Sequence, residues 1–348
     1  MASPRESDGY RRGPLAKVFP SPARPASWRR AAGADGGYGA ADSPDWRGID
    51  WQAHLHQVQI AERSVNYVDL GDADATPAVF IHGLGGCWQN WLENLPRVAL
   101  QRRVVALDLP GFGSSELPVK PISITSFAAT VDALCDVLDL GPIALVGNSM
   151  GGFTGAEVAI RHPDRVERLV LVDAAGISIT RAFDKMTMQA AKVISPPVSA
   201  DPEYIRRIFS RPAFIQTAFG SVMRHPTRLA RDLLAEQIHG TGKPGFIPAM
   251  QALLTYDFTD RLGEISCPTL IVQGSEDFLV PLGDAFEFER RIPGATTLIL
   301  DDTGHVPMIE RPRTFDNALM EFLDRTGAPD EPSAAAEPAL GEVPSHPV

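Results

Sequence analysis

Residues 143–152 of this 348-residue chain are Ile-Ala-Leu-Val-Gly-Asn-Ser-Met-Gly-Gly, a short apolar run that stops at a serine between glycines. The apolar run predicts a buried strand, and residues 153–161 (Phe-Thr-Gly-Ala-Glu-Val-Ala-Ile-Arg) predict a helix. Ser149 therefore falls on a strand-to-helix turn with the pattern Gly-x-Ser-x-Gly. We expect glycine at positions 147 and 151 because a Cβ there would collide with neighbouring backbone.

The helix after Ser149 is expected to point its N-terminus at the serine side chain. Free N–H groups and the positive end of the helix dipole favour an anion, which is the charge that develops on a carbonyl oxygen under nucleophilic attack. The backbone N–H of Met150 is the donor that we expect there. The pattern alone also fits an ordinary turn in which the serine caps the helix, so the remainder of the chain decides between the two.

The composition is that of an ordinary globular protein, with 44% hydrophobic and 22% charged residues. A net charge of −11 argues against binding to nucleic acid, and no nucleic-acid-binding motif is visible. Three widely spaced cysteines, Cys87, Cys135 and Cys267, indicate neither a disulfide framework nor a zinc site. Because no long apolar segment or secretory signal is visible, the sequence predicts a cytoplasmic protein without a transmembrane segment. Peripheral membrane contact stays open.

Two tails flank the predicted domain. Residues 1–45 and 327–348 are rich in Pro and Ala and have almost no periodic apolar pattern, so we predict that both are disordered. Between them, residues 46–176 and 245–326 form the two parts of the predicted core. Residues 177–244 interrupt it with helical patterns at 183–193, 201–210 and 227–239, and a structureless loop of that length would be uncommon. They predict an inserted helical cap.

Strands and helices alternate through the predicted core. Before the cap the patterns predict a hairpin at 57–60 and 64–70, strands at 77–82, 104–107 and 169–172, and helices at 88–99 and 127–138. After the cap they predict helices at 245–256, 282–291 and 306–322 and strands at 270–273 and 297–300. The alternation predicts an α/β fold with a mostly parallel, doubly wound sheet and helices on both faces. Sites in such sheets are built at the strand ends.

Two later strand ends carry the partners that a serine nucleophile needs. Gln273-Gly-Ser-Glu-Asp277 follows one strand, and Asp301-Asp-Thr-Gly-His305 follows the next. A serine hydroxyl is a weak nucleophile, so an imidazole must take its proton and a carboxylate must orient that imidazole. Ser149, Asp277 and His305 occur in the chain order expected for this arrangement on a doubly wound sheet.

The choice of Asp277 as the acid rests on its position alone. Asp173 ends the preceding strand, and Glu276, Asp301 and Asp302 lie close in sequence, so all four stay open as candidates for the same role.

A glycine-rich loop at residues 83–86, Gly-Leu-Gly-Gly, follows another buried strand. Its backbone can supply a second hydrogen bond to an oxyanion, and we expect the donor to be the N–H of Leu84. His82 precedes the loop and is expected to support it by hydrogen bonding rather than to act as the base. Cys87 after the loop is expected to be a small buried hydrophobe, because no basic residue close in sequence would lower its pKa.

The Ser149 turn, Asp277, His305 and the glycine-rich loop together resemble the α/β-hydrolase fold family over about residues 46–326. The family's His-Gly-x-Gly loop donates from the residue after His-Gly, which corresponds to Leu84. Residues 108–115 (Asp-Leu-Pro-Gly-Phe-Gly-Ser-Ser) and Gly304-His305 are similar to other segments of the family, and the predicted cap lies where members carry theirs. Ser149 argues against the family's epoxide hydrolases and haloalkane dehalogenases, which use an aspartate there.

The predicted activity is hydrolysis of a small carboxylic ester with an apolar moiety through an acyl-Ser149 intermediate, as in a carboxylesterase or lipase. This chemistry requires neither a metal nor an organic cofactor. The substrate-binding residues and the oligomeric state do not follow from the sequence. Several aromatic and methionine residues of the cap are candidates either for an acyl pocket or for ordinary packing: Phe183, Met186, Met188, Phe209, Phe214, Phe219 and Met223.

The closest rival activity is carbon-carbon bond hydrolysis of a vinylogous diketone. Residues 147–152 and 261–265 (Arg-Leu-Gly-Glu-Ile) resemble the hydrolases of ring-cleavage products. The chain departs from those enzymes at residues 84–86, where they carry a Gly-Pro-containing loop, and at Val306, where they carry a tryptophan. A cofactor-free perhydrolase is a third candidate, and a non-catalytic binding protein with the same fold is a fourth.

Overall fold

The structure, a computed structural model, describes residues 29–31, 37–42, 44–178 and 211–325. Within these residues the centre is a nine-stranded sheet in the order β1-β9-β8-β7-β6-β4-β5-β3-β2. β3 pairs antiparallel with β2 and β5, and the other pairs are parallel, which confirms the predicted mostly parallel sheet. The strands are β1 (Arg29–Ala31), β2 (Leu55–Ile60), β3 (Arg63–Leu70), β4 (Pro77–Ile81), β5 (Arg103–Leu107), β6 (Ile143–Asn148), β7 (Val166–Val172), β8 (Thr269–Gly274) and β9 (Thr296–Leu300).

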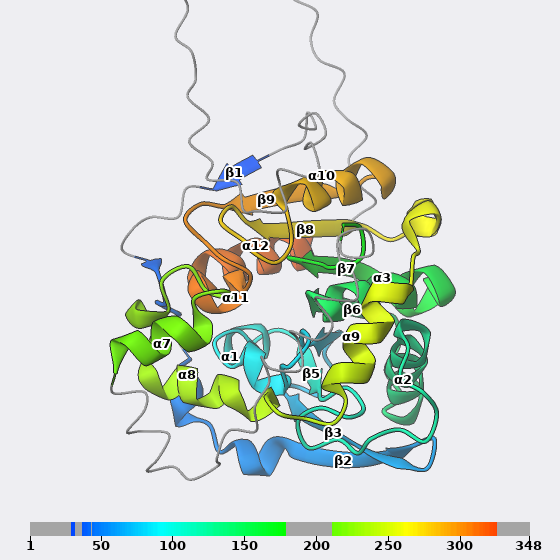
Figure 1. Cartoon of the computed structure of the whole chain (residues 1–348). Helices are drawn as coiled ribbons and strands as arrows, with labels where there is room; N and C mark the ends of the chain where they lie inside the picture. Colours follow the sequence, from blue (N-terminus) through cyan, green and yellow to red (C-terminus); the bar gives the residue numbers. More distant parts are fainter. Residues whose placement is uncertain (1–28, 32–36, 43, 179–210, 326–348) are drawn as a thin grey trace, which may run out of the picture.

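Helices cover both faces of the sheet (Figure 1). On one side lie α2 (Ile124–Val137), α3 (Met150–Arg161), α9 (Phe246–Thr255) and α10 (Leu282–Arg291). On the other lie α1 (Leu95–Val98), α7 (Pro212–Phe219), α8 (Arg231–Gln237), α11 (Pro307–Glu310) and α12 (Pro312–Asp324). Short 3-10 turns are η3 (Trp46–Gly48), η4 (Trp51–His54), η5 (Trp88–Trp91), η6 (Pro163–Arg165), η7 (Pro226–Arg228), η8 (Ile238–Gly240) and η9 (Thr259–Glu264).

Two helices that the sequence predicts as continuous are divided in the structure. The segment predicted at 88–99 forms η5 and α1, and the one predicted at 306–322 forms α11 and α12. Pro96, Pro307 and Pro312 stand in the first turn of α1, α11 and α12. Proline has no N–H for a bond within a helix but fits the first turn, so each proline begins a new helix.

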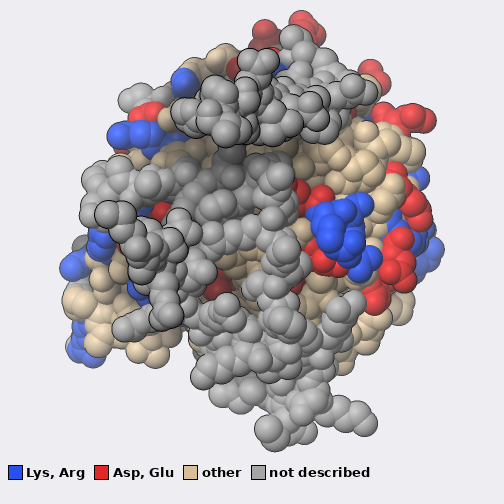
Figure 2. Space-filling model, turned by 90° about the horizontal axis from the view of Figure 1, so that it is seen from above, with Lys and Arg blue, Asp and Glu red and all other residues tan. Residues whose placement is uncertain are grey.

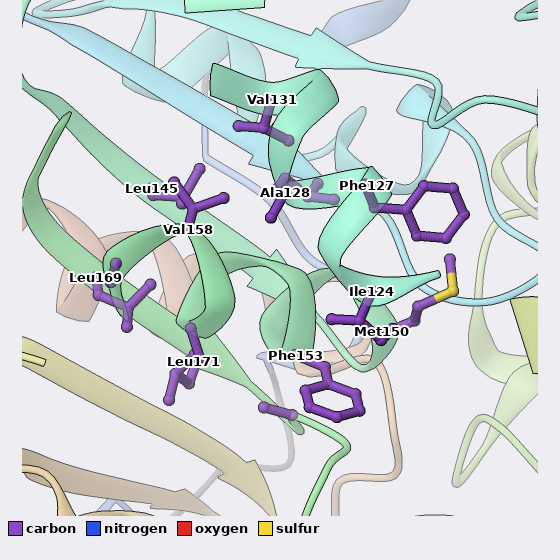
Figure 3. Close-up of a cluster of buried hydrophobic side chains, with 14 of the residues drawn as sticks. Ile124, Phe127, Ala128, Val131, Leu145, Met150, Phe153, Val158, Leu169 and Leu171 are labelled. Atoms are coloured by element: carbon purple, nitrogen blue, oxygen red, sulfur yellow. The ribbon is translucent and has the colours of Figure 1, made fainter. Parts of the chain in front are cut away.

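The apolar core consists of two clusters, one on each face of the sheet. In β6, Ile143 and Leu145 belong to one cluster and Ala144 and Val146 to the other. Successive side chains of a strand point to opposite faces, so a continuous apolar run is what a strand covered on both sides requires. Figure 3 shows the first cluster, in which side chains of α2 and α3 meet those of the strands.

The predicted cap is described only in part. The helical patterns at 183–193 and 201–210 lie outside the described residues, and the C-terminal tail at 327–348 does so too. The pattern at 227–239 contains α8, whose Leu233 and Leu234 are buried against the core. The boundaries of the cap and of the two core parts stay predictions.

Part of the N-terminal stretch predicted to be disordered takes part in the fold. Residues 29–31 form β1, which is parallel to β9, and the Tyr38 side chain is buried and donates a hydrogen bond to Glu310 Oε2 at 2.7 Å. The prediction is therefore wrong for residues 29–31 and 37–42. The prediction relied on local composition. The partners of these residues, β9 and Glu310, lie near the C-terminal end of the core.

The sheet brings the segments after several parallel strands to one edge. Ile81 of β4 pairs with Gly147 of β6, and Asn148 of β6 pairs with Val172 of β7. Farther along the sheet, β7 pairs with β8 and β8 with β9, again in parallel. The order reverses between β6 and β4, and this reversal is where open α/β sheets bind their ligands.

The surface carries charges of both signs. On the face shown in Figure 2, basic and acidic side chains lie next to one another. On α10, hydrogen bonds from Arg290 and Arg291 outweigh partial burial and lower the pKa of Glu287 to about 2. Among the described residues there is no helix with the length and apolar character needed to cross a membrane.

We predict that Gly147→Ala destabilises the protein by about 3 kcal/mol or more, because inserted atoms in a close-packed site force the backbone apart. A Cβ at Gly147 would lie 2.3 Å from the backbone oxygen of Gly151, and neither atom belongs to a flexible side chain. Thermal unfolding followed by circular dichroism measures the loss. Gly141→Ala is the matched control, since a Cβ there meets nothing within 4 Å. Equal midpoints for the two variants would contradict the prediction.

Candidate active site

Ser149 has a backbone conformation that side-chain-bearing residues seldom adopt. Its φ is 55° and its ψ is −115°, at the junction of β6 and α3. The close approach of the flanking backbone explains both glycines, because a Cβ at Gly151 would lie 2.2 Å from the backbone oxygen of Ile81. The Ser149 N–H donates to Val172 O at 2.9 Å, which ties the turn to β7. This geometry is the one expected from the Gly-x-Ser-x-Gly pattern.

The glycine-rich loop after β4 lies beside this turn. A Cβ at Gly83 would come within 3.3 Å of Ser149 Cβ. The Gly86 N–H donates to Gly83 O at 3.0 Å, and Gly85 has a φ of 74°, which a type II turn requires at its third residue. In a trans peptide the N–H points away from the preceding C=O. Fixing the Gly83 carbonyl therefore also fixes the direction of the Leu84 N–H.

His82 holds this loop through both ring nitrogens. Its Nε2 accepts a hydrogen bond from the Leu109 N–H at 3.0 Å, so the ring proton is on Nδ1, which donates to Gly83 O at 2.7 Å. Burial lowers the pKa of His82, which keeps the ring neutral. The prediction that His82 supports the loop is confirmed.

The two predicted oxyanion donors have free N–H groups. Within the described part of the chain, neither the Leu84 N–H nor the Met150 N–H has a hydrogen-bond acceptor. Met150 is the first residue of the twelve-residue helix α3, whose first N–H groups have no partner inside the helix. Both donors come from segments adjacent to Ser149.

His305 and Asp277 lie together, as predicted. His305 Nδ1 and Asp277 Oδ2 are 2.7 Å apart, and the Asp277 side chain is fully buried. Asp277 Oδ1 accepts the N–H groups of Leu279 and Val280. Burial alone would raise the pKa of Asp277, but the imidazole and these hydrogen bonds hold it below its ordinary value. A neutral His305 that donates from Nδ1 has Nε2 available as a proton acceptor.

Hydrogen bonds to backbone groups fix the segment that carries His305. The Asn148 side chain, next to Ser149, donates to His305 O at 3.1 Å, and the His305 N–H donates to Val222 O at 2.8 Å. The Gly304 N–H donates to Glu310 Oε1 at 2.9 Å. The histidine segment is thereby attached to the serine turn on one side and to the chain after α7 on the other.

Glu310 and Tyr38 complete this attachment. Glu310 Oε2 accepts from the Tyr38 hydroxyl at 2.7 Å and from the Arg224 N–H at 2.8 Å. The Tyr38 oxygen in turn accepts the His225 N–H at 2.8 Å. Sequence reasoning missed Tyr38, Glu310 and the role of Asn148. The only signal in the sequence for any of these roles was the glutamate in the apolar run of residues 306–310.

Of the four rival acids, Asp173 has a carboxylate oxygen within 4.8 Å of both Asp277 and His305. Its Oδ1 accepts from Gln273 Nε2 at 2.8 Å and from the Gly274 N–H at 3.0 Å. Burial and the neighbouring Asp277 raise the pKa of Asp173 well above its ordinary value. Asp302 instead accepts a hydrogen bond from His225 at 2.9 Å. The carboxylate that contacts His305 is that of Asp277.

Within the described part of the chain, Asp173, Asp277 and His305 have potential metal-ligand atoms within 4.8 Å of one another. The His305 nitrogen and the Asp277 oxygen are engaged in one short hydrogen bond. A metal ion would need both atoms to coordinate it instead. We therefore interpret the group as one that holds protons.

Other predicted residues have structural roles in the described region. Cys87 is buried, and burial raises its pKa, as expected of a small hydrophobe. Met223 and Phe219 pack against the core, and Phe214 is exposed. The remaining pocket candidates, Phe183, Met186, Met188 and Phe209, lie outside the described residues.

Comparison with known proteins agrees with this geometry. The model of a family described as the alpha/beta hydrolase family matches residues 78–318. A 2-hydroxy-6-oxo-6-phenylhexa-2,4-dienoate hydrolase from Comamonas testosteroni is 27% identical over 288 residues, covering 78% of this chain and 95% of its own. A poly(3-hydroxyalkanoate) depolymerase from Ectopseudomonas oleovorans is 29% identical over 256 residues, covering 73% and 87%.

Solved structures show the same fold. A bacterial membrane phospholipase A superimposes with a TM-score of 0.62 at 26% identity, over 78% of this chain and 86% of that one.

We predict that Tyr38→Phe destabilises the protein by about 1–3 kcal/mol, because it leaves the buried Glu310 carboxylate and the His225 N–H each short of a partner. Chemical denaturation measures the change. Tyr67→Phe is the control, since the Tyr67 hydroxyl is also on a buried residue but forms no hydrogen bond within the described chain. An equal effect of the two substitutions would show that the Tyr38 hydroxyl contributes no stability.

Proposed function

The chain belongs to the alpha/beta hydrolase family, and from this premise we propose that it is a serine hydrolase that cleaves a carboxylic ester with an apolar moiety. The observation that carries the proposal is the 2.7 Å contact between His305 Nδ1 and Asp277 Oδ2, on a segment bonded to the residue before Ser149. An oriented imidazole, on a segment bonded to the residue before a serine on a strained turn, supports activation of that serine's hydroxyl group.

In the proposed reaction Ser149 Oγ attacks the ester carbonyl carbon while its proton passes to His305 Nε2. Asp277 stabilises the imidazolium through Nδ1–H. The carbonyl oxygen becomes an anion, which the N–H groups of Leu84 and Met150 stabilise. The free N–H groups of both residues support this role.

The intermediate then collapses and the bond to the alcohol oxygen breaks. The imidazolium returns its proton to the leaving alkoxide, which departs as the alcohol and leaves an acyl group on Ser149. Water attacks this acyl group with His305 as the base, and the acid is released as Ser149 regains its proton. All these steps use side chains, backbone and water, so the proposed mechanism requires neither a metal nor an organic cofactor.

Apolar side chains around the glycine loop support an apolar substrate. Leu84 and Phe246 pack, partly exposed, against the cluster that contains Met150 and Phe153. The Phe246 ring lies 3.2 Å from where a Cβ on Gly85 would be. The proposed partner is therefore a small apolar ester. Three buried free cysteines fit a proposed cytoplasmic location.

A carbon-carbon bond hydrolase is the second candidate function. The Comamonas testosteroni relative, whose name denotes a dienoate hydrolase, matches 78% of this chain. The names of the depolymerase and of the phospholipase A instead refer to ester substrates, and the glycine loop Leu84-Gly85-Gly86 lacks the proline of the ring-cleavage type. We favour the ester.

We predict that Ser149→Ala abolishes turnover of p-nitrophenyl esters, lowering kcat by about a millionfold as in other enzymes with a serine-histidine-aspartate triad. Stopped-flow and steady-state absorbance at the p-nitrophenolate band measure the rate. Labelling with a fluorophosphonate probe should disappear in the same variant.

Ser64→Ala is the matched control for this experiment, because Ser64 lies on the β2–β3 hairpin, where its hydroxyl bonds Gln57. It should retain both turnover and labelling. Retention of half the activity by the Ser149→Ala protein would exclude Ser149 as the nucleophile.

We predict that a panel of esters graded by acyl-chain length, assayed beside a vinylogous diketone, gives the higher kcat/KM for an ester. The reason is that the glycine loop Leu84-Gly85-Gly86 lacks the proline of the ring-cleavage type and lies in partly apolar surroundings. A higher kcat/KM for the diketone would assign the chain to carbon-carbon bond hydrolysis instead.

A further inference from the structure

Two carboxyl groups lie together behind His305, although the proposed reaction uses only one. Asp173 follows β7 and Asp277 follows β8, and both side chains are fully buried. Each has a carboxylate oxygen within 4.8 Å of the other and of a His305 ring nitrogen. Two like charges buried this close repel each other strongly, so one of the two carboxyl groups is expected to keep its proton.

The hydrogen-bond donors show which group is ionised. Both oxygens of Asp277 accept hydrogen bonds, Oδ2 from His305 and Gln273 and Oδ1 from two backbone N–H groups. In Asp173 only Oδ1 accepts, from Gln273 and Gly274. Asp173 Oδ2 is buried and accepts no hydrogen bond from any of the residues that the structure describes. Donors favour the charged form of a carboxyl group, so the charge resides on Asp277.

We propose that Asp173 is a neutral carboxylic acid whose Oδ2–H donates a hydrogen bond to the Asp277 carboxylate, and that it thereby serves as a positioning residue for the His305 pair. The role in catalysis rests on the proposed function, whereas the protonation of Asp173 does not. Gln273 Nε2 donates to Asp173 Oδ1 at 2.8 Å and to Asp277 Oδ2 at 3.1 Å, so the two carboxyl groups lie side by side. Through the proposed hydrogen bond Asp173 fixes the Asp277 carboxylate, to which His305 is also bonded.

This arrangement gives the group the charge that the proposed reaction needs. With Asp173 neutral, the three side chains carry one negative charge at rest, and none when His305 takes the proton of Ser149. With both carboxyl groups ionised, the buried group would carry two adjacent negative charges at rest, which burial strongly disfavours. Among the described residues near Asp173, Asp277 and Glu310 are both acidic and raise its pKa, which favours the neutral form.

The first test is Asp173→Asn, because asparagine has the shape of a neutral aspartic acid. The Gly274 N–H and the Gln273 amide require an acceptor in the place of Oδ1, so the asparagine oxygen takes that place. Its NH₂ group then takes the place of Oδ2–H and donates to Asp277. We expect kcat for p-nitrophenyl esters, and its pH profile, to stay within about threefold of the wild type.

Asp173→Ala removes the donor, and kcat should fall by about tenfold to a hundredfold, the effect of losing one hydrogen bond to a charged group. KM should change little, since Asp173 does not touch the substrate. A loss of about 10⁴-fold in Asp173→Asn, the loss expected of a triad acid, would overturn the proposal. Equal kcat values for the alanine and asparagine variants would overturn the positioning role.

Infrared spectroscopy tests the protonation without reference to activity. At neutral pH the wild type should have a carboxylic-acid carbonyl band from Asp173 that the Asp173→Asn variant lacks. The wild-type minus Asp173→Asn difference spectrum should therefore contain this band. Asp316→Asn is the matched control. Asp316 is a buried acid that accepts a hydrogen bond from Asn94 on the far side of the sheet, so its loss should leave both kcat and the Asp173 band in place. Absence of the band from the wild-type minus Asp173→Asn difference spectrum would overturn the proposal.

The same spectra recorded in Ser149→Ala protein separate the two proposals. A band present there, with ester turnover unaffected by Ser149→Ala, would reject the proposed function and leave the neutral Asp173 standing. Loss of turnover in the Ser149→Ala protein, together with absence of the band, would reject the neutral Asp173 and leave the proposed function standing.

Discussion

The close contact of three backbone segments at Ser149 is the constraint on which the rest of the site depends. The backbone of α3 passes so near to β6 and to the end of β4 that a Cβ at Gly147 or Gly151 would lie 2.2–2.3 Å from a backbone oxygen. This contact holds Ser149 at a φ of 55°, a conformation that the chain keeps only because its surroundings enforce it. The ends of β4, β6 and β7 are thereby placed relative to one another.

Around this contact, buried polar side chains fix each loop by bonding to backbone. His82 holds the carbonyl of the glycine loop, Asn148 holds the His305 carbonyl, and Glu310 holds the N–H before His305. Each of these side chains is buried. Unpaired polar groups at such positions would cost stability, so the same bonds that satisfy the side chains also set the positions of the loops.

Electrostatics adds a second constraint to the packing. Asp277 keeps its charge because donors surround both of its oxygens, while the described part of the chain supplies donors to only one oxygen of Asp173. Two adjacent aspartates of the same chemistry therefore differ in ionisation because of their surroundings alone. In a family that supports many reactions on one fold, such differences at a few positions can set the chemistry.

The sequence by itself determined the α/β fold, the mostly parallel sheet and the position of Ser149 on its turn. Apolar runs without polar alternation, glycine spacing and the order of strands and helices are local properties, and they carry this information directly. Sequence order also brought Asp277 and His305 to adjacent strand ends, because parallel strands end at one edge.

Only the tertiary structure decided which carboxylate contacts His305, because Asp173 and Asp277 both follow buried strands and their sequences do not differ in any decisive way. The same holds for Tyr38, which a composition rule assigned to a disordered tail and which in fact bonds a glutamate 272 positions away. Such contacts depend on where distant segments pass in space, and no local pattern encodes that. The divided helices at Pro96 and Pro312 could have been predicted from the chain, whereas the partners of Glu310 could not.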